Sequence, residues 1–487
     1  GGRRFDRDSW QYNLLHRWIE SSARGAESPA EIVRLEVTPA ELVFGESLQQ
    51  ATLRVIAVWD DGSREDVTPL ARFRSNDESV VMVDSDGRLQ STGAGDSHVI
   101  AFYDNGVAAV PVMRAAQLSS SSSRLLPSAG TVARTDVDRW VAGKLAKLDI
   151  VPSGICTDAE FLRRVSIDLT GTLPTPNEVE SFLVDRSKDK RDRKIDQLLE
   201  RPTYAAWWAN KFCDYTGCNP SQQAELGQQS AVQWYTWIFH RLLENTPYDE
   251  MIQRIVLAVG RDEEQSFDEY CEQQTASFQD AESQRFARRR TMPHYWTRRN
   301  LAEPEDKALA FAHSFLGIRL QCAQCHKHPF APWTQDDFKQ FAAFFEPVRY
   351  GVAPQTDQRY RQLAAKVGMN LRGDQGAAVR VDLLKRVGDD ELVPWRELYI
   401  ADRDKSQSLS LLRSGTVDIA PQEDPRSVIM EWMKQPDHPW FARSLVKRVW
   451  ASYFGVGIID PPDDLSPANP PSNPALLEGL TRGFVAN

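Results

Sequence analysis

One short motif in this sequence combines residue types that hold a metal cofactor: Cys322-Ala323-Gln324-Cys325-His326. The pattern Cys-x-x-Cys-His is typical of covalent attachment of a c-type haem. Two thiols three residues apart on a tight turn can form thioethers with the two vinyl groups of one porphyrin, and His326 then serves as the proximal iron ligand. The motif therefore predicts haem c at Cys322, Cys325 and His326, with a redox role.

Other interpretations of these residues stay open. Cys-x-x-Cys also serves thiol redox chemistry, although no thioredoxin-like βαβ pattern surrounds it here. Cys322, Cys325, His326 and His328 could together hold a metal ion. The motif could also be accidental, with Cys322 and Cys325 joined as a disulfide in a protein without a cofactor.

The motif leaves the sixth iron ligand and the propionate contacts unspecified. Distal ligand candidates are Met292, His294, His313, His328 and Met369. Arg298 and Arg299 could contact the haem propionates, because a guanidinium binds a carboxylate through two parallel hydrogen bonds. The simpler interpretation of these arginines is a solvated surface that balances the acidic stretch 262–269.

The remaining four cysteines need separate explanations. Cys213 and Cys218 could form a local disulfide in an oxidising compartment. Cys156 and Cys271 could pair with each other or be buried apolar residues.

Helical patterns dominate from about residue 134 to the end, and they must position the motif. Apolar residues predict a helix over 308–320 that carries His313, and a second helix with Phe338, Phe341, Phe344 and Phe345. These phenylalanines could line a haem edge, although a helical core is the better interpretation of each one. Upstream, Thr175-Pro176-x-Glu178 predicts a helix start with proline at the first position.

Residues 30–115 change to the alternating pattern of half-buried strands. Turn sequences interrupt the strands at 60–62, 84–87 and 104–106, where Asp-Gly or Asn-Gly pairs supply the positive φ angles of tight hairpins. Short strands with regular turns predict a β-sandwich. A run of five serines follows, and such tracts stay flexible.

Length and charge set limits on the class of protein. The chain has 487 residues, which predicts more than one domain. Its net charge of −10 argues against broad nucleic-acid binding, which needs a basic surface. No apolar run approaches the roughly 20 residues of a membrane helix.

Several long strings resemble a family of large planctomycete proteins built around cytochrome-c-associated domains of unknown function. They lie at residues 161–176, 322–330, 333–338, 439–450 and 469–474. Residues 37–39, 59–63, 67–68 and 87–89 resemble a bacterial group 2 Ig-like domain. Residues 1–25 are similar to the last helix of a cytochrome c domain that precedes the Ig-like domain in that family. The resemblance implies an exported fragment, periplasmic or at the cell surface, whose cytochrome lies upstream.

We therefore expect a multidomain protein in which an Ig-like β-sandwich precedes a mainly α-helical body. The expected parts are the end of a cytochrome c-like domain (1–27), the Ig-like sandwich (30–115), a Ser-rich linker (116–133), the helical domain with the motif (134–350), a mixed region (351–425) and the start of a truncated helical domain (426–487).

The expected function is electron transfer by haem c, with a redox protein or a neighbouring cytochrome domain as the partner. One alternative is a haem- or metal-dependent oxidoreductase acting on an unknown substrate, glycan-linked substrates included. The other is a cell-surface interaction protein that holds no cofactor and contacts a surface or a glycan.

Overall fold

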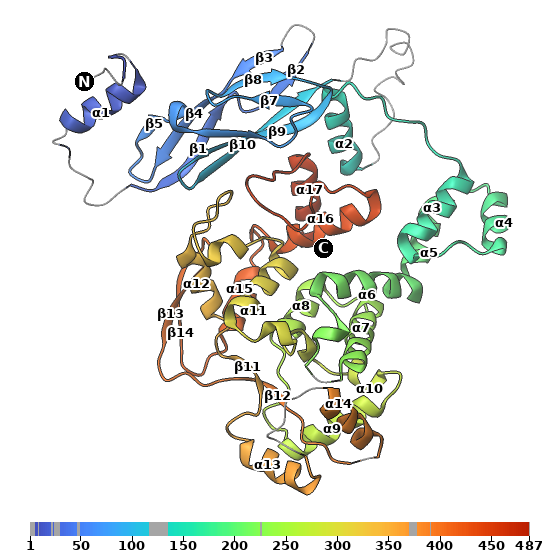
Figure 1. Ribbon diagram of the computed structural model, residues 1–487. Helices are drawn as coiled ribbons and strands as arrows, with labels where there is room; N and C mark the ends of the chain where they lie inside the picture. Colours follow the sequence, from blue (N-terminus) through green and yellow to red (C-terminus); the bar gives the residue numbers. More distant parts are fainter. Residues whose placement is uncertain are drawn as a thin grey trace. The chain divides into compact units, whose positions relative to one another are not determined.

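The computed structural model describes residues 5–7, 9–20, 23, 30–45, 49–115, 135–224, 226–369, 377–389 and 391–486 (Figure 1). The chain divides into two compact units, each assembled from separate stretches of sequence. The first unit contains Gly1–Ser153, Lys327–Trp333 and Ile458–Asn487, and the second contains Gly154–His326 and Thr334–Gly457. The expected Ser-rich linker (116–133) lies outside the described residues. Within the described residues, every helix is too short or too polar to cross a membrane.

The first unit is built on a β-rich region of small sheets. One sheet has the strand order β1-β4-β5, a second β2-β10-β9-β6 and a third β3-β8-β7. The strands are β1 (Ile32–Thr38), β2 (Leu42–Phe44), β3 (Gln50–Thr52), β4 (Arg54–Trp59), β5 (Arg64–Asp66), β6 (Arg72–Ser75), β7 (Val81–Val83), β8 (Arg88–Ser91), β9 (Gly95–Tyr103) and β10 (Gly106–Arg114).

The turn sequences predict the hairpins correctly. The turn at 60–62 joins β4 to β5, the turn at 84–87 joins β7 to β8, and the turn at 104–106 joins β9 to β10. Gly62 and Gly87 have φ angles of +80° and +76°, a region that glycine enters without a steric penalty. Apolar side chains such as Phe44, Val99 and Val112 then pack into a buried cluster between the strands.

Two helices distant in sequence complete the first unit. α2 (Asp136–Lys147) forms ion pairs with the β-rich region, from Lys144 to Asp96 and from Lys147 to Glu41, both at 2.7 Å. α17 (Pro474–Ala486) follows Asn473, whose side chain donates to the main-chain oxygen of Trp140 in α2. Residues near both ends of the helical sequence therefore belong to the same compact unit as the strands.

The N-terminal helix is shorter than the expected 1–27 segment. α1 spans Trp10–Glu20 and buries none of its residues. Trp18 is 50% exposed and Ile19 is 64% exposed. The helix itself was predicted correctly, and its origin in a cytochrome domain stays a prediction.

The second unit is mainly helical and contains two short antiparallel strand pairs. Its strands are β11 (Val348–Gly351) paired with β12 (Glu397–Ile400), and β13 (Gln407–Leu411) paired with β14 (Gly415–Ile419). Its α-helices are α3 (Asp158–Thr170), α4 (Pro176–Val184), α5 (Lys190–Leu199), α6 (Pro202–Thr216), α7 (Gly227–Leu243), α8 (Tyr248–Val256), α9 (Phe267–Gln279), α10 (Gln284–Ala287), α11 (Pro304–Phe311), α12 (Gln335–Ala343), α13 (Asp357–Lys366), α14 (Ala377–Gly388), α15 (Pro425–Met433) and α16 (Phe441–Phe454).

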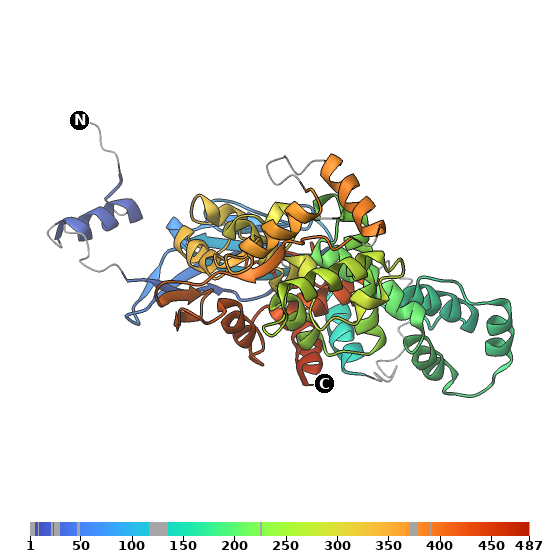
Figure 2. The ribbon, with the colours of Figure 1, turned by 90° about the horizontal axis from the view of Figure 1, so that it is seen from below.

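Helices α3, α4 and α5 form a small group at one side of this unit, and α6 leads from them into its main body (Figures 1 and 2). The predicted helix start at 175–178 is confirmed. Thr175 is the N-cap of α4, its hydroxyl accepts from the Glu178 main-chain N–H, and the Glu178 carboxylate accepts from the Thr175 N–H. This reciprocal pair satisfies main-chain donors that the helix cannot satisfy itself.

The predicted helix over 308–320 is wrong in length. The α-helix α11 ends at Phe311, a π-helical turn occupies Ala312–Leu316, and Gly317 then takes a left-handed conformation with φ of +63°. A left-handed glycine ends a helix because the next residues can no longer follow its axis. His313 consequently lies on the wide π turn.

The phenylalanines after the motif form core, as the simpler interpretation predicts. Phe341 and Phe345 are fully buried, and their ring centroids lie 5.5 Å apart. Phe345 also contacts Phe311 at 5.2 Å and Trp296 at 5.5 Å. Aromatic contacts of this kind add to the free energy of burial. These rings therefore stabilise the hairpin that carries the motif.

Candidate functional site

The Cys-x-x-Cys-His motif forms a single tight turn on the surface of the second unit. Gln321–Gln324 is a 3₁₀-helical turn, and the Cys325 N–H donates to the Cys322 main-chain oxygen. In a 3₁₀-helix, side chains three residues apart lie on the same side. Cys322 and Cys325 are therefore brought to one side of the turn, where both are exposed free thiols. His326 follows directly, and it is also exposed.

The turn is anchored to the core from two directions. Ala323, between the two cysteines, is fully buried, as is Leu320 before them. From α12, the Gln335 side-chain amide donates to the main-chain oxygen of Gln324 at 3.0 Å and of Cys325 at 3.4 Å. Thr334 caps α12 in a capping box with Asp337, which sets where Gln335 begins the helix.

Helix α16 holds the chain just before the turn. Lys447 and Arg448 are buried, and their cations donate to main-chain oxygens of the π turn and of the glycine that ends it. Lys447 Nζ lies 3.1 Å from Gly317 O, and Arg448 lies 2.5 Å from Ser314 O. These bonds satisfy carbonyl groups that the end of a helix leaves without a partner. The segments 304–326 and 441–454 thus stabilise one another.

The loop after the motif belongs to the first unit, so the boundary between the units falls between His326 and Lys327. Lys327 pairs with Asp104 at 2.7 Å, and the Phe330 ring contacts the Phe102 ring at 5.9 Å. His328 accepts from the Phe330 N–H through Nδ1 at 3.2 Å.

The distal candidates Met292 and His294 lie inside the core of the second unit. Met292 is fully buried. His294 stacks on Phe286 with ring centroids 4.5 Å apart, and its Nε2 shares a hydrogen bond with Gln233 Oε1 at 2.9 Å. Burial lowers the pKa of His294 to about 3, so the imidazole is neutral. An iron ligand from this segment would require the core to open.

The other iron-ligand candidates have different surroundings. His313 is half-buried on the π turn, and Met369 packs against the cluster that contains Tyr270 and Trp395. Across the described residues, no three His, Cys, Asp or Glu side chains are close enough together to hold a metal ion. The turn itself carries one exposed imidazole, that of His326, as a proximal haem ligand requires.

The two arginines proposed for the propionates differ sharply in exposure. Arg298 is 7% exposed, and its guanidinium donates to the main-chain oxygens of Tyr295 and Gly217. Arg299 is exposed and donates to Ala224 O at 3.1 Å. Arg299 can therefore reach a ligand at the surface without unfolding, whereas Arg298 is part of the interior.

All six cysteines are free thiols in the structure. Cys156 is exposed, whereas Cys271 is fully buried and burial raises its pKa to about 12. Cys213 and Cys218 lie together, half-buried, at the end of α6. The structure holds the latter two as free thiols, so the disulfide between them stays a prediction.

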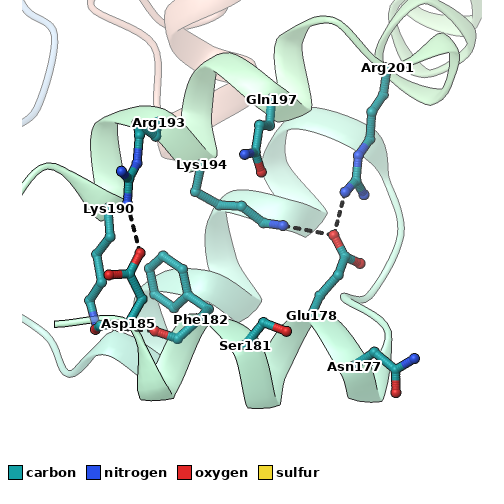
Figure 3. Close-up of a pocket in the computed structure, with 10 residues that line it drawn as sticks. All are labelled: Asn177, Glu178, Ser181, Phe182, Asp185, Lys190, Arg193, Lys194, Gln197 and Arg201. Atoms are coloured by element: carbon teal, nitrogen blue, oxygen red, sulfur yellow. Dashed lines mark hydrogen bonds and ion pairs between the residues drawn. The ribbon is translucent and has the colours of Figure 1, made fainter. Parts of the chain in front are cut away.

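Sequence analysis missed a surface hollow of about 450 Å³ between α4 and α5 (Figure 3). Lys194 and Arg201 both donate to the Glu178 carboxylate, and Arg193 pairs with Asp185. These contacts hold the pKa of Glu178 far below its ordinary value, with the Arg201 hydrogen bond as the largest cause. These ion pairs join the two helices, and the cations that line the hollow outnumber its carboxylates.

Two parts of the chain are similar to known protein families. Residues 136–350 match the family PSCyt2, described as a protein of unknown function (DUF1549). Residues 425–487 match PSD1, described as a protein of unknown function (DUF1553). Both are domains typical of planctomycete-type proteins, and neither description states an activity. No curated protein matches the chain.

Proposed function

We propose that this chain is an extracytoplasmic c-type haem protein that transfers electrons within a multidomain redox assembly. Cys322 and Cys325 would attach the haem, and His326 would be the proximal iron ligand. The main support for this proposal is the geometry of the turn, in which two free thiols lie on one side of a 3₁₀ turn and an exposed imidazole follows them. These residues fit the group, because both sulfurs and the imidazole are accessible from outside the fold.

The attachment requires nothing from the chain except reduced thiols. Each thiol adds across one vinyl double bond: a carbon–sulfur bond forms, the thiol hydrogen goes to the neighbouring vinyl carbon, and no electrons are lost. Gln335 and the buried Ala323 keep the turn in place while both sulfurs react. When bound, the haem supplies one-electron chemistry at its iron. Arg299 would contact a propionate.

The β-rich region supports the assembly part of the proposal. Its hairpins and its apolar cluster fit the expected Ig-like sandwich, whose role would be a spacer or an adhesive contact. Export to the periplasm or the cell surface would supply the machinery that attaches haem c. The electron partner would be a redox protein or a neighbouring cytochrome domain.

The test is expression of the full chain in a host with haem c maturation, followed by intact mass measurement and a pyridine haemochrome spectrum. We expect one covalent haem. A mass without the haem increment, together with a Cys322–Cys325 disulfide, would refute the proposal and favour the cofactor-free interaction protein.

A second function, haem-dependent oxidation of a substrate, is favoured by one observation. Met292 and His294 are buried and engaged elsewhere, which would leave the distal face of the iron open. A high-spin spectrum of the purified protein would favour this enzyme, and a low-spin spectrum would favour electron transfer. Replacement of His313 alone would reveal whether it is the sixth ligand.

A further inference from the structure

The thiols of Cys213 and Cys218 are brought together by the way α6 ends. Gly217 ends the helix with φ of +75°. The Cys218 N–H then donates to Cys213 O at 2.8 Å, and the Gly217 N–H donates to Asp214 O at 3.2 Å. These two bonds define a Schellman motif, in which the residue after the glycine contacts the residue that accepts its hydrogen bond. Cys218 and Cys213 occupy those two positions.

The thiols make specific contacts in this motif. The Cys213 and Cys218 side chains interact directly, because each one shifts the pKa of the other. The Cys218 thiol in turn donates weakly to Ala231 O in α7, with sulfur and oxygen 3.8 Å apart. Both cysteines are half-buried, so reagents from solvent can reach them. The two interacting thiols are therefore only partly buried.

A buried cation distinguishes the two sulfurs. The Arg298 guanidinium is close to Gly217. It donates to neutral main-chain oxygens, of Gly217 at 3.3 Å and of Tyr295 at 3.0 Å. The Cys213 hydrogen bond is the largest cause that lowers the pKa of Cys218, and the Arg298 charge also lowers it, against burial and the Asp214 carboxylate. The same hydrogen bond raises the pKa of Cys213. The Arg298 charge acts on Cys218 and is not among the causes that shift the pKa of Cys213, so it favours the thiolate at Cys218.

We infer that Cys213 and Cys218 are a thiol–disulfide exchange site, in which Cys218 is the attacking sulfur, Cys213 the resolving sulfur, and the substrate an external disulfide. The Schellman contact carries this inference, with Arg298 as the positioning charge. It does not depend on haem at Cys322 and Cys325.

The reaction balances without any group beyond that disulfide. The Cys218 thiolate attacks one sulfur of the external disulfide, the sulfur–sulfur bond breaks, and the first leaving thiolate takes up a proton. Cys213, after losing its proton to solvent, attacks Cys218 in the mixed disulfide and releases the second thiol. The two protein thiols are oxidised, and the external disulfide is reduced to two thiols.

Glutathione is the probe for the first experiment. The full chain is equilibrated in buffers of reduced and oxidised glutathione, trapped by alkylation and digested with trypsin. One tryptic peptide, residues 212–241, contains both cysteines, and the other four cysteines lie outside it. We expect a reversible disulfide inside this peptide. Cys213→Ser should accumulate glutathione on Cys218, whereas Cys218→Ser should carry at least about tenfold less on Cys213.

A second experiment tests the role of the buried arginine. Arg298→Met should slow alkylation of Cys218 near neutral pH several-fold, because less thiolate is present. Arg288→Met, at an exposed arginine from the same stretch, should leave the rate unchanged. Circular dichroism of each variant checks the fold, and Arg298→Lys, which keeps the charge, should restore part of the rate.

The inference is overturned if residues 212–241 stay fully reduced in oxidised glutathione. It is also overturned if Cys213 accepts glutathione as readily as Cys218. Equal alkylation rates in folded Arg298→Lys and Arg298→Met proteins would refute the positioning role of the charge.

Discussion

The two thiol pairs of this protein differ in what each sulfur faces. Cys322 and Cys325 lie on one side of an exposed 3₁₀ turn, directed outward, and an exposed imidazole follows them. Cys213 and Cys218 interact with each other at a helix end, half-buried, where Arg298 donates to the intervening Gly217. The first arrangement suits reaction of both sulfurs with one external group, and the second suits reaction of the sulfurs with each other. The spacing of the cysteines, three residues in the exposed pair and five in the half-buried pair, does not by itself reveal this difference.

The largest expected effect comes from removing the exposed pair. Cys322→Ala with Cys325→Ala should abolish covalent haem, because no thioether can form. Cys213→Ala with Cys218→Ala should retain the haem. Intact mass and the haemochrome spectrum measure both. Equal loss of haem in the two double variants would show that the two thiol pairs do not differ in haem attachment.

The glycine between the half-buried cysteines gives the next largest effect. In Gly217→Ala the new Cβ would clash with the Arg298 guanidinium, at a φ of +75°. We expect a loss of about 2 kcal/mol or more in the free energy of unfolding, since left-handed backbone alone costs an L-residue about 1–2 kcal/mol. Closure of the Cys213–Cys218 disulfide should slow as the helix end is displaced.

Gly368→Ala is the matched control for that variant. Gly368 has a similar φ of +67°, and a methyl group added there would meet no other atom within 4 Å. Thermal denaturation of Gly368→Ala should therefore show only the free-energy cost of the left-handed backbone. A Gly217→Ala protein as stable as this control would show that Arg298 does not pack against the helix end.

Acid should weaken the core around the half-buried pair. His294 has a pKa of about 3 in the folded protein and about 6.5 when unfolded, so the unfolded chain binds more protons between these values. The neutral His294 ring therefore contributes its full stabilisation of the folded protein above pH 6.5, and this stabilisation is lost as the pH falls. We expect the free energy of unfolding to fall by about 1.4 kcal/mol when the pH is lowered from 6 to 5.

The measurement for this prediction is the melting temperature against pH, compared with His294→Gln. Glutamine keeps a hydrogen-bonding group near Gln233 and cannot titrate, so its curve should be flatter in this range. Parallel curves for the two proteins would contradict the assignment.

The smallest effect concerns the support of the exposed turn. Gln335→Ala removes the donors to the main-chain oxygens of Gln324 and Cys325. We expect a loss of about 1 kcal/mol, typical of one hydrogen bond, and a lower yield of attached haem. Gln362→Ala, at an exposed position of α13, should change neither quantity.

Local features of the fold were predictable from the sequence. The hairpins at 60–62, 84–87 and 104–106 and the start of α4 at Thr175 all depend on residues within four positions of one another. The Cys-x-x-Cys-His turn is local in its own main-chain hydrogen bond, from Cys325 to Cys322, although Gln335 supports it from α12. Patterns of this range carry their own hydrogen-bond partners, so they predict local structure without knowledge of the rest of the chain.

Long-range packing decided what the sequence could not. The helix predicted over 308–320 ends as an α-helix at Phe311 and continues only as a π turn that Gly317 closes. Main-chain oxygens of this turn and of Gly317 accept hydrogen bonds from Arg448 and Lys447, which lie on a helix distant in sequence. Met292 and His294 are iron-ligand candidates by residue type, and both are buried; His294 stacks on Phe286 and shares a hydrogen bond with Gln233. Likewise, α2 joins the strands through ion pairs to Asp96 and Glu41.

The sequence by itself therefore determined the two sets of thiols, the turn of the exposed pair and the strand-then-helix order of the chain. Only the tertiary structure decided that Cys218 lies beside a buried arginine and that Cys322 and Cys325 face outward. The physical reason is that the hydrogen bonds of a turn act over a few residues, whereas burial and charge around a sulfur come from segments that folding brings together.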